Sequence, residues 1–148
     1  MAYLPDVARL ELAQRRSYHA ADTSPIDPAL FAELSPEELA AALVEFAPSV
    51  RVVQSAWPIL DIWHFNMTEG APQPSSVAQD VLVTRADFDP QMHTLPEGAA
   101  LLIETLTKGT ALGPALESVE AKHPDFDFSS LLGLLIQTSA ITAVSPPV

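Results

Sequence analysis

The chain has 148 residues, 48% of them hydrophobic, which suits one ordinary domain or two small lobes and argues against disorder throughout. Seven basic side chains stand against nineteen acidic ones, and this net charge of −12 disfavours nucleic acid as a partner, because duplex binding depends largely on lysine and arginine. The lack of cysteine excludes disulfides, thiolate metal sites and a cysteine nucleophile. Since neither a signal peptide nor an apolar run of about 18 residues is visible, we expect a cytoplasmic protein with no membrane partner.

The first part of the chain, residues 1–67, predicts a lobe of helices with one strand. In its opening helix, Val7, Leu10 and Tyr18 recur at helical spacing and should share the buried face. Ser35 and Pro36 start a later helix as its N-cap and first helical residue. The expected elements are helices at Leu4–Ala21, Pro28–Glu33, Pro36–Glu45 and Trp57–Asn66, and a valine-rich strand at Ser49–Ser55.

A flexible connection is predicted next, because the segment TEGAPQPSS is rich in residues typical of loops. We therefore expect a linker at 68–78 and a second lobe at 79–148, which ends in a tail at Pro146 and Pro147. The expected elements of this lobe are strands at Gln79–Arg85 and Phe88–Leu95, helices at Pro96–Lys108, Leu112–Lys122 (capped by Thr110) and Phe126–Thr138, and a closing strand at Ala140–Val144. A hairpin, three helices and a final strand follow the order of a winged-helix-like lobe. The fold class is therefore α+β and mostly helical.

Patterns typical of catalytic or metal sites are missing from the sequence. The four histidines show no His-x-x-His or His-x-x-x-His spacing, and no serine lies in a Gly-x-Ser-x-Gly elbow. Asp61 and His64 are three residues apart, but aromatic neighbours favour a structural role for this histidine. Trp57 and Trp63 suit a binding platform or, as we favour, a core cluster. We expect no enzyme activity, no metal and no cofactor.

The third helix of the second lobe tests the possibility of DNA binding, since this helix enters the major groove in helix-turn-helix proteins. Residues 126–141 contain no lysine, arginine or histidine, and the lobe as a whole is acidic. A winged-helix shape without cations is better suited to protein than to DNA. One protein-binding mode is strand addition at the hairpin, where the edge of Val81, Leu82 and Val83 would accept an extended peptide. The alternative is an ordinary wing shielded by Asp80 and Arg85.

Several stretches carry a resemblance to a known family. YLPDVARLELAQRRSYHAADTSPID (Tyr3–Asp27) and LSPEELAAALVEFAPSVRVVQSAWPILDIW (Leu34–Trp63) resemble the region after the N-terminal helical domain of HvfC/BufC-type proteins, a family labelled as DNA-binding. LPEGAALLIETLTKGTALGPALESV (Leu95–Val119) and DFSSLLGLLIQTSAITAV (Asp127–Val144) are similar to the rest of that C-terminal domain. The opening Leu-Pro-Asp-x-Ala-Arg-Leu-Glu is the most specific part.

The resemblance implies an accessory domain without a catalytic motif, preceded in family members by an N-terminal helical domain that this chain lacks. Some members are partner subunits of multinuclear iron-dependent enzymes that modify ribosomally made peptides, and the iron belongs to the enzyme. Their C-terminal lobe is similar to PqqD-like domains, in which a precursor peptide pairs with the wing near the third helix. Carried over, this implies a peptide site at Val81, Leu82 and Val83, with Leu131 or Leu135 nearby.

Two alternatives to this accessory role stay open. One is a transcriptional regulator that binds DNA through the N-terminal domain or as a dimer. The other is a structural scaffold that forms a homodimer through the apolar third helix.

Overall fold

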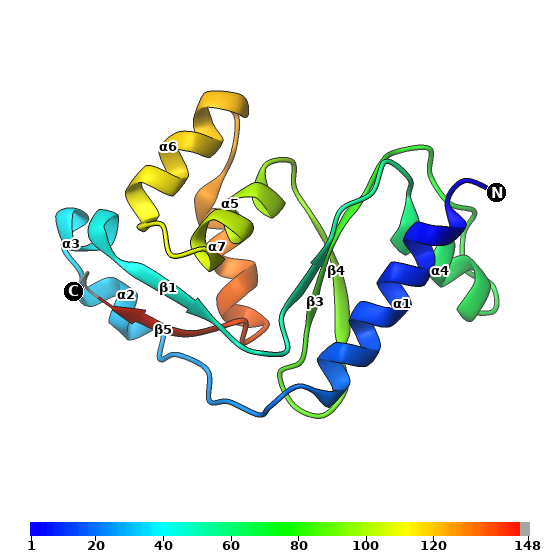
Figure 1. Cartoon of the computed structure of the whole chain (residues 1–148), viewed down its shortest axis with the longest axis horizontal. Helices are drawn as coiled ribbons and strands as arrows, with labels where there is room; N and C mark the ends of the chain where they lie inside the picture. The colour runs from blue at the N-terminus through cyan, green and yellow to red at the C-terminus, as the bar shows by residue number, and fades with distance from the viewer. Residues whose placement is uncertain (146–148) are drawn as a thin grey trace. The chain divides into compact units, whose positions relative to one another are not determined.

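The computed structural model describes residues 1–145 and confirms an α+β chain that is mostly helical (Figure 1). The tail at Pro146 and Pro147 lies outside the described residues. The elements in chain order are α1 (Leu4–His19), α2 (Ala29–Glu33), α3 (Pro36–Ala41), β1 (Leu43–Phe46), β2 (Arg51–Val53), α4 (Ile59–Met67), β3 (Asp80–Thr84), β4 (Gln91–Leu95), α5 (Ala99–Thr107), α6 (Leu112–Lys122), α7 (Phe128–Gln137) and β5 (Ile141–Ser145). No helix in this range is long and apolar enough to cross a membrane.

The chain forms two compact units, each assembled from two separate stretches of sequence. Unit 1 comprises residues 1–20 and 49–95, and unit 2 comprises residues 21–48 and 96–148. This division differs from the expected one at 68–78, because β2 pairs with the hairpin strand β3. The pairing holds the hairpin against the N-terminal elements in unit 1. The predicted order of hairpin, three helices and closing strand is present, but the hairpin and the helices belong to different units.

Unit 1 is an antiparallel sheet in the order β2-β3-β4 with α1 and α4 packed on one face. Valines from β2 and β3 meet apolar residues of both helices in its core, which contains Leu10, Ala13, Val53, Ile59, Leu60, Val81 and Val83. Trp63 and Met92 pack against this core while partly buried. Tyr18, expected inward, is 53% exposed, and Trp57, favoured as core, is 41% exposed. The opening helix thus buries Leu10 and Ala13 and ends at His19. The side chain of Tyr18, in its last turn, remains exposed to solvent.

The side chains of Asp61 and Gln79 anchor the expected linker inside unit 1. The Gln79 amide oxygen accepts hydrogen bonds from the Leu60 and Asp61 backbone N–H groups, both 3.0 Å, at the start of α4. Its amide nitrogen donates to Asp61 Oδ1 over 3.0 Å, and Ser75 N donates to Asp61 Oδ2 over 3.1 Å. These bonds tie both the N-terminal end of α4 and the segment 68–78 to one carboxylate. The segment is therefore a loop within unit 1.

Unit 2 contains a two-stranded antiparallel sheet of β1 and β5, against which α5 packs. The helix expected at Pro36–Glu45 includes residues 43–45, but the sequence Leu-Val-Glu-Phe at 43–46 is extended and pairs with β5. The Ser35 side chain caps α3 as predicted, whereas Ala111 takes the place expected for Thr110 before α6. Unit 2 buries Leu102, Leu112, Val119, Leu131, Leu135 and Ile141 almost completely.

Gly98 explains why α5 begins at Ala99 and not at Pro96. Its φ of 91° lies in the left-handed region that disfavours residues with a Cβ. A Cβ at this position would also lie 3.1 Å from the His123 ring and from Val119 Cγ1. Glycine therefore permits both the turn before α5 and its close approach to the end of α6.

Candidate peptide-binding surface

The structure places the five predicted site residues in two different units. Val81, Leu82 and Val83 form the middle of β3 in unit 1, and Leu131 and Leu135 lie on α7 in unit 2. All five side chains are at most 1% exposed. Each therefore contributes to packing, and none presents its side chain to a ligand.

The expectation of an unpaired edge at Val81–Val83 is wrong, because β3 is the central strand of the sheet. Val81 pairs with Val53 on one side and with Thr94 on the other. Leu82 and Val83 likewise have a strand partner on each side. The sequence predicts a third strand at Ser49–Ser55, but its composition does not indicate that this strand pairs with the hairpin.

An outer edge of the sheet lies on β4, the second strand of the hairpin. Its five residues, Gln91–Leu95, pair with β3 on one side only. Within the part of the chain that the structure describes, no backbone hydrogen bond joins β4 to a further segment. No lysine, aspartate, glutamate or proline interrupts the strand, although such residues commonly protect an edge from pairing. β4 therefore retains the backbone groups that an added strand would use.

A hollow of about 620 Å³ adjoins the start of β4 in unit 1. We call it the α1–α4 hollow, and its lining comprises Glu11, Gln14, Arg15, Tyr18, Trp63, Met67, Asp89 and Pro90. The first four residues come from α1, the next two from α4, and the last two from the loop that leads into β4. Its volume falls in the range of about 300–1,000 Å³ that is usual for ligand sites.

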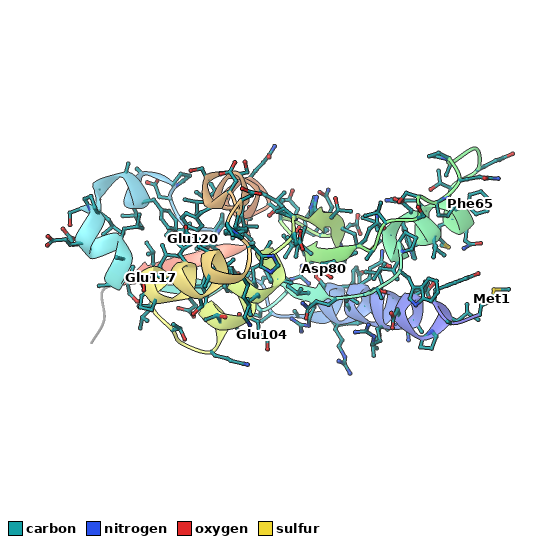
Figure 2. The ribbon with its side chains drawn as sticks, turned by 90° about the horizontal axis from the view of Figure 1, so that it is seen from above. Met1, Phe65, Asp80, Glu104, Glu117 and Glu120 are labelled. Atoms are coloured by element: carbon teal, nitrogen blue, oxygen red, sulfur yellow. The ribbon has the colours of Figure 1, made fainter. Side chains whose placement is uncertain are left out.

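Exposed apolar side chains gather in unit 1, around these two features and elsewhere on its surface. Of the ten large hydrophobic residues exposed among those described, nine belong to unit 1 and only Leu30 belongs to unit 2. Met67 is 63% exposed in the lining of the hollow, and Phe88 is 85% exposed in the adjoining loop. Figure 2 labels Phe65, another exposed aromatic residue, on α4. Contiguous exposed apolar groups commonly mark an interaction surface, and Tyr18, Met67 and Phe88 lie in or beside the hollow.

The carboxylates and histidines of the described residues bear on the possibility of metal binding or acid–base chemistry. No group of three or more histidine, cysteine, aspartate or glutamate side chains there is arranged to hold a metal ion. Asp61 and His64 do line a second hollow of about 370 Å³. However, hydrogen bonds from Gln79 and then from Ser75 lower the pKa of Asp61 and keep it in the charged, hydrogen-bonded form. This carboxylate therefore serves to hold the loop and is a poor proton acceptor.

Comparison of the chain with known protein families, with curated proteins and with solved structures finds no match. The assignment of function consequently depends on the geometry of the chain itself. Sequence reasoning missed both the outer edge of β4 and the α1–α4 hollow. The available signal was the uncharged stretch between Pro90 and Pro96, which is consistent with an edge strand.

Proposed function

We propose that this chain is a non-catalytic interaction domain that binds an extended peptide as an additional strand along β4. The observation that supports this proposal best is the outer edge of β4, which among the described residues has no strand partner on that side and which carries no lysine, arginine, aspartate or glutamate. In strand addition, backbone hydrogen bonds supply affinity and pockets beside the strand supply specificity. The α1–α4 hollow is such a pocket beside β4.

The charge distribution favours a protein partner over nucleic acid. Unit 2 carries twelve acidic side chains and two lysines, a net charge of −10, and α7 has no basic residue. Its acidic residues include Glu104 on α5 and Glu117 and Glu120 on α6, labelled in Figure 2. A helix that reads DNA requires cations near phosphates and donors near base edges. The third helix here has neither a lysine nor an arginine.

The resemblance to HvfC/BufC-type proteins adds a more specific form of this proposal. The peptide would be the precursor of a ribosomally made product, and a separate iron-dependent enzyme would modify it while this chain holds it. The position of the binding site moves in this proposal from β3 to β4. The partner enzyme would supply all of the chemistry.

NMR spectroscopy of the isotope-labelled chain tests the proposal directly. The chain would be titrated with the precursor peptide encoded nearest its gene and, separately, with a 20-base-pair DNA duplex, at low and physiological salt. We expect the peptide to shift the amide signals of residues 91–95 at both salt concentrations. Thr94→Lys, which introduces an edge charge at an exposed position, should weaken binding by about tenfold. Ser118→Lys, on the exposed surface of α6, is the matched control and should bind normally.

Two outcomes would contradict the proposal. Peptide binding that shifts only unit 2 signals would remove β4 as the site. Salt-sensitive binding of the duplex, without binding of the peptide, would instead favour the DNA-binding regulator.

A further inference from the structure

We infer that the α1–α4 hollow selects peptides with a large apolar anchor residue followed closely by a lysine or arginine. This inference rests on the proposed function, because the hollow would act on a peptide already paired with β4. It adds the chemistry of the ligand, which strand pairing through the backbone leaves unspecified.

The apolar part of the hollow combines one partly buried ring with two more exposed neighbours. Trp63 packs against the core of unit 1 and is partly buried, so its position is set by the fold. Met67 and Tyr18 are more than half exposed, so their surfaces are accessible to an inserted side chain. Methionine adapts readily to different apolar shapes, and aromatic rings provide a large contact area. These three side chains suit an aromatic or long aliphatic anchor.

The charged part of the hollow favours a cation on the peptide. Glu11 and Asp89 contribute two carboxylates, whereas Arg15 contributes one guanidinium, so the lining keeps a net charge of −1. None of the three forms an ion pair or a side-chain hydrogen bond with another described residue, so no internal ion pair must break when a ligand binds. A cation would also interact favourably with the faces of Trp63 and Tyr18. Unit 1 as a whole carries a net charge of −2, which is also favourable for a basic peptide.

The position of the hollow links it to the strand edge. Pro90 lines the hollow and is directly followed by Gln91, the first residue of β4. Met92 of β4 packs on the same core as Trp63, so alternate residues of β4 point toward the face that α1 and α4 cover. A strand added to β4 would direct its own alternate side chains to that face. One of them would reach the hollow.

A display library of random twelve-residue peptides, selected on the intact purified chain, tests this inference. We expect the enriched peptides to share a large apolar residue with a lysine or arginine one or two positions later. Synthetic copies of the best peptide would then be measured by fluorescence anisotropy. Met67→Ala should weaken binding by about tenfold, and Asp89→Lys by about five- to tenfold at low salt, with a smaller effect at high salt.

Matched variants separate this inference from the proposed function. Glu69→Lys changes the charge as Asp89→Lys does, but at an exposed position outside the lining, and should leave affinity within about twofold. Selection on Asp89→Lys should reduce the preference for basic peptides. If enriched peptides shift the amides of β4 but lack the apolar–basic pattern, or bind Met67→Ala normally, the inference is overturned and the proposed function stands. If no peptide is enriched and none shifts β4, both fail.

Discussion

Units 1 and 2 differ sharply in what they expose. Unit 1 has five arginines and seven acidic side chains, a net charge of −2, whereas the net charge of unit 2 is −10. Unit 1 also exposes nine of the ten large hydrophobic residues that are exposed in the described part of the chain. The bulk charge of −12 is therefore mainly a property of unit 2. The total charge of the chain therefore says little about the surface of unit 1, where the candidate site lies.

The largest expected effect comes from removing a buried side chain from one unit alone. Leu135 is 1% exposed on α7, and Leu135→Ala should cost about 2–5 kcal/mol through lost apolar contacts and a residual cavity. We expect the amides of unit 2 to lose more hydrogen-exchange protection than those of unit 1. The control, Leu30→Ala in the same unit, removes a 44% exposed side chain and should cost less than about 1 kcal/mol. Equal loss of protection in both units would show that the division in structure has no counterpart in stability.

The next effect concerns the end of α1, which a single arginine of unit 1 holds in place. The Arg85 guanidinium donates to the carbonyl oxygens of Ser17 and Ala20 over 2.8 and 3.0 Å, and also to that of Tyr18. A cation is also favourable at the negative end of a helix. Arg85→Met should therefore lower the free energy of unfolding by about 2 kcal/mol. Arg16→Met, an exposed change in the same last turn, should cost less than about 0.5 kcal/mol, as measured by urea denaturation. Equal costs would mean that the three carbonyl contacts contribute nothing.

Local patterns in the sequence predicted the elements of both units well, since each depends on neighbouring residues. Ser35 capped α3 as its position indicated, and the three-to-four spacing of Val7 and Leu10 indicated the buried face of α1. The main error in local structure was at residues 43–46. The helix predicted there reached Glu45, whereas Leu-Val-Glu-Phe forms a strand that is stabilised by pairing with a strand almost 100 residues later.

The grouping of the elements was not predictable in the same way. Pairing of β2 with β3 joins Val53 to Val81 across a loop whose composition suggests a linker. That loop is ordered by Gln79, which caps a helix that begins twenty residues before it. The expectation of an unpaired edge at β3 was wrong for the same reason. Pairing with β2 decides that β3 is the central strand of the sheet and that β4 lies at its edge. The hollow likewise combines residues from three separate segments.

A smaller effect should follow from breaking the cap that Gln79 supplies to α4. Gln79→Ala removes an acceptor for two helix N-terminal amides and a donor to Asp61, so we expect a loss of about 1 kcal/mol. Hydrogen exchange at residues 59–62 and 68–76 should increase more than exchange in the rest of unit 1. Gln73→Ala, an exposed amide in the same loop, is the control and should change little. Unchanged exchange in Gln79→Ala would show that the loop is held by other contacts.

The smallest effect is a pH dependence in unit 1 that arises on β4 itself. Burial lowers the pKa of His93 below its ordinary value of 6.5, and its Nε2 lies 3.3 Å from the hydroxyl of Thr84. The unfolded chain therefore takes up a proton at this residue before the folded chain does. Stability should fall as the pH decreases below about 6.5, and this loss should stop once the folded form is protonated as well. The lowered pKa values of Asp6, Asp61 and Asp127 act in a separate window, below their ordinary value of 3.8. Between pH 7 and 5, His93→Gln should flatten the dependence of urea stability on pH. Peptide pairing along β4 should further bury His93. Bound peptide should therefore steepen the dependence of stability on pH in the native chain, and it should leave this dependence unchanged in His93→Gln. A slope that is the same with and without peptide would place the bound strand away from this edge.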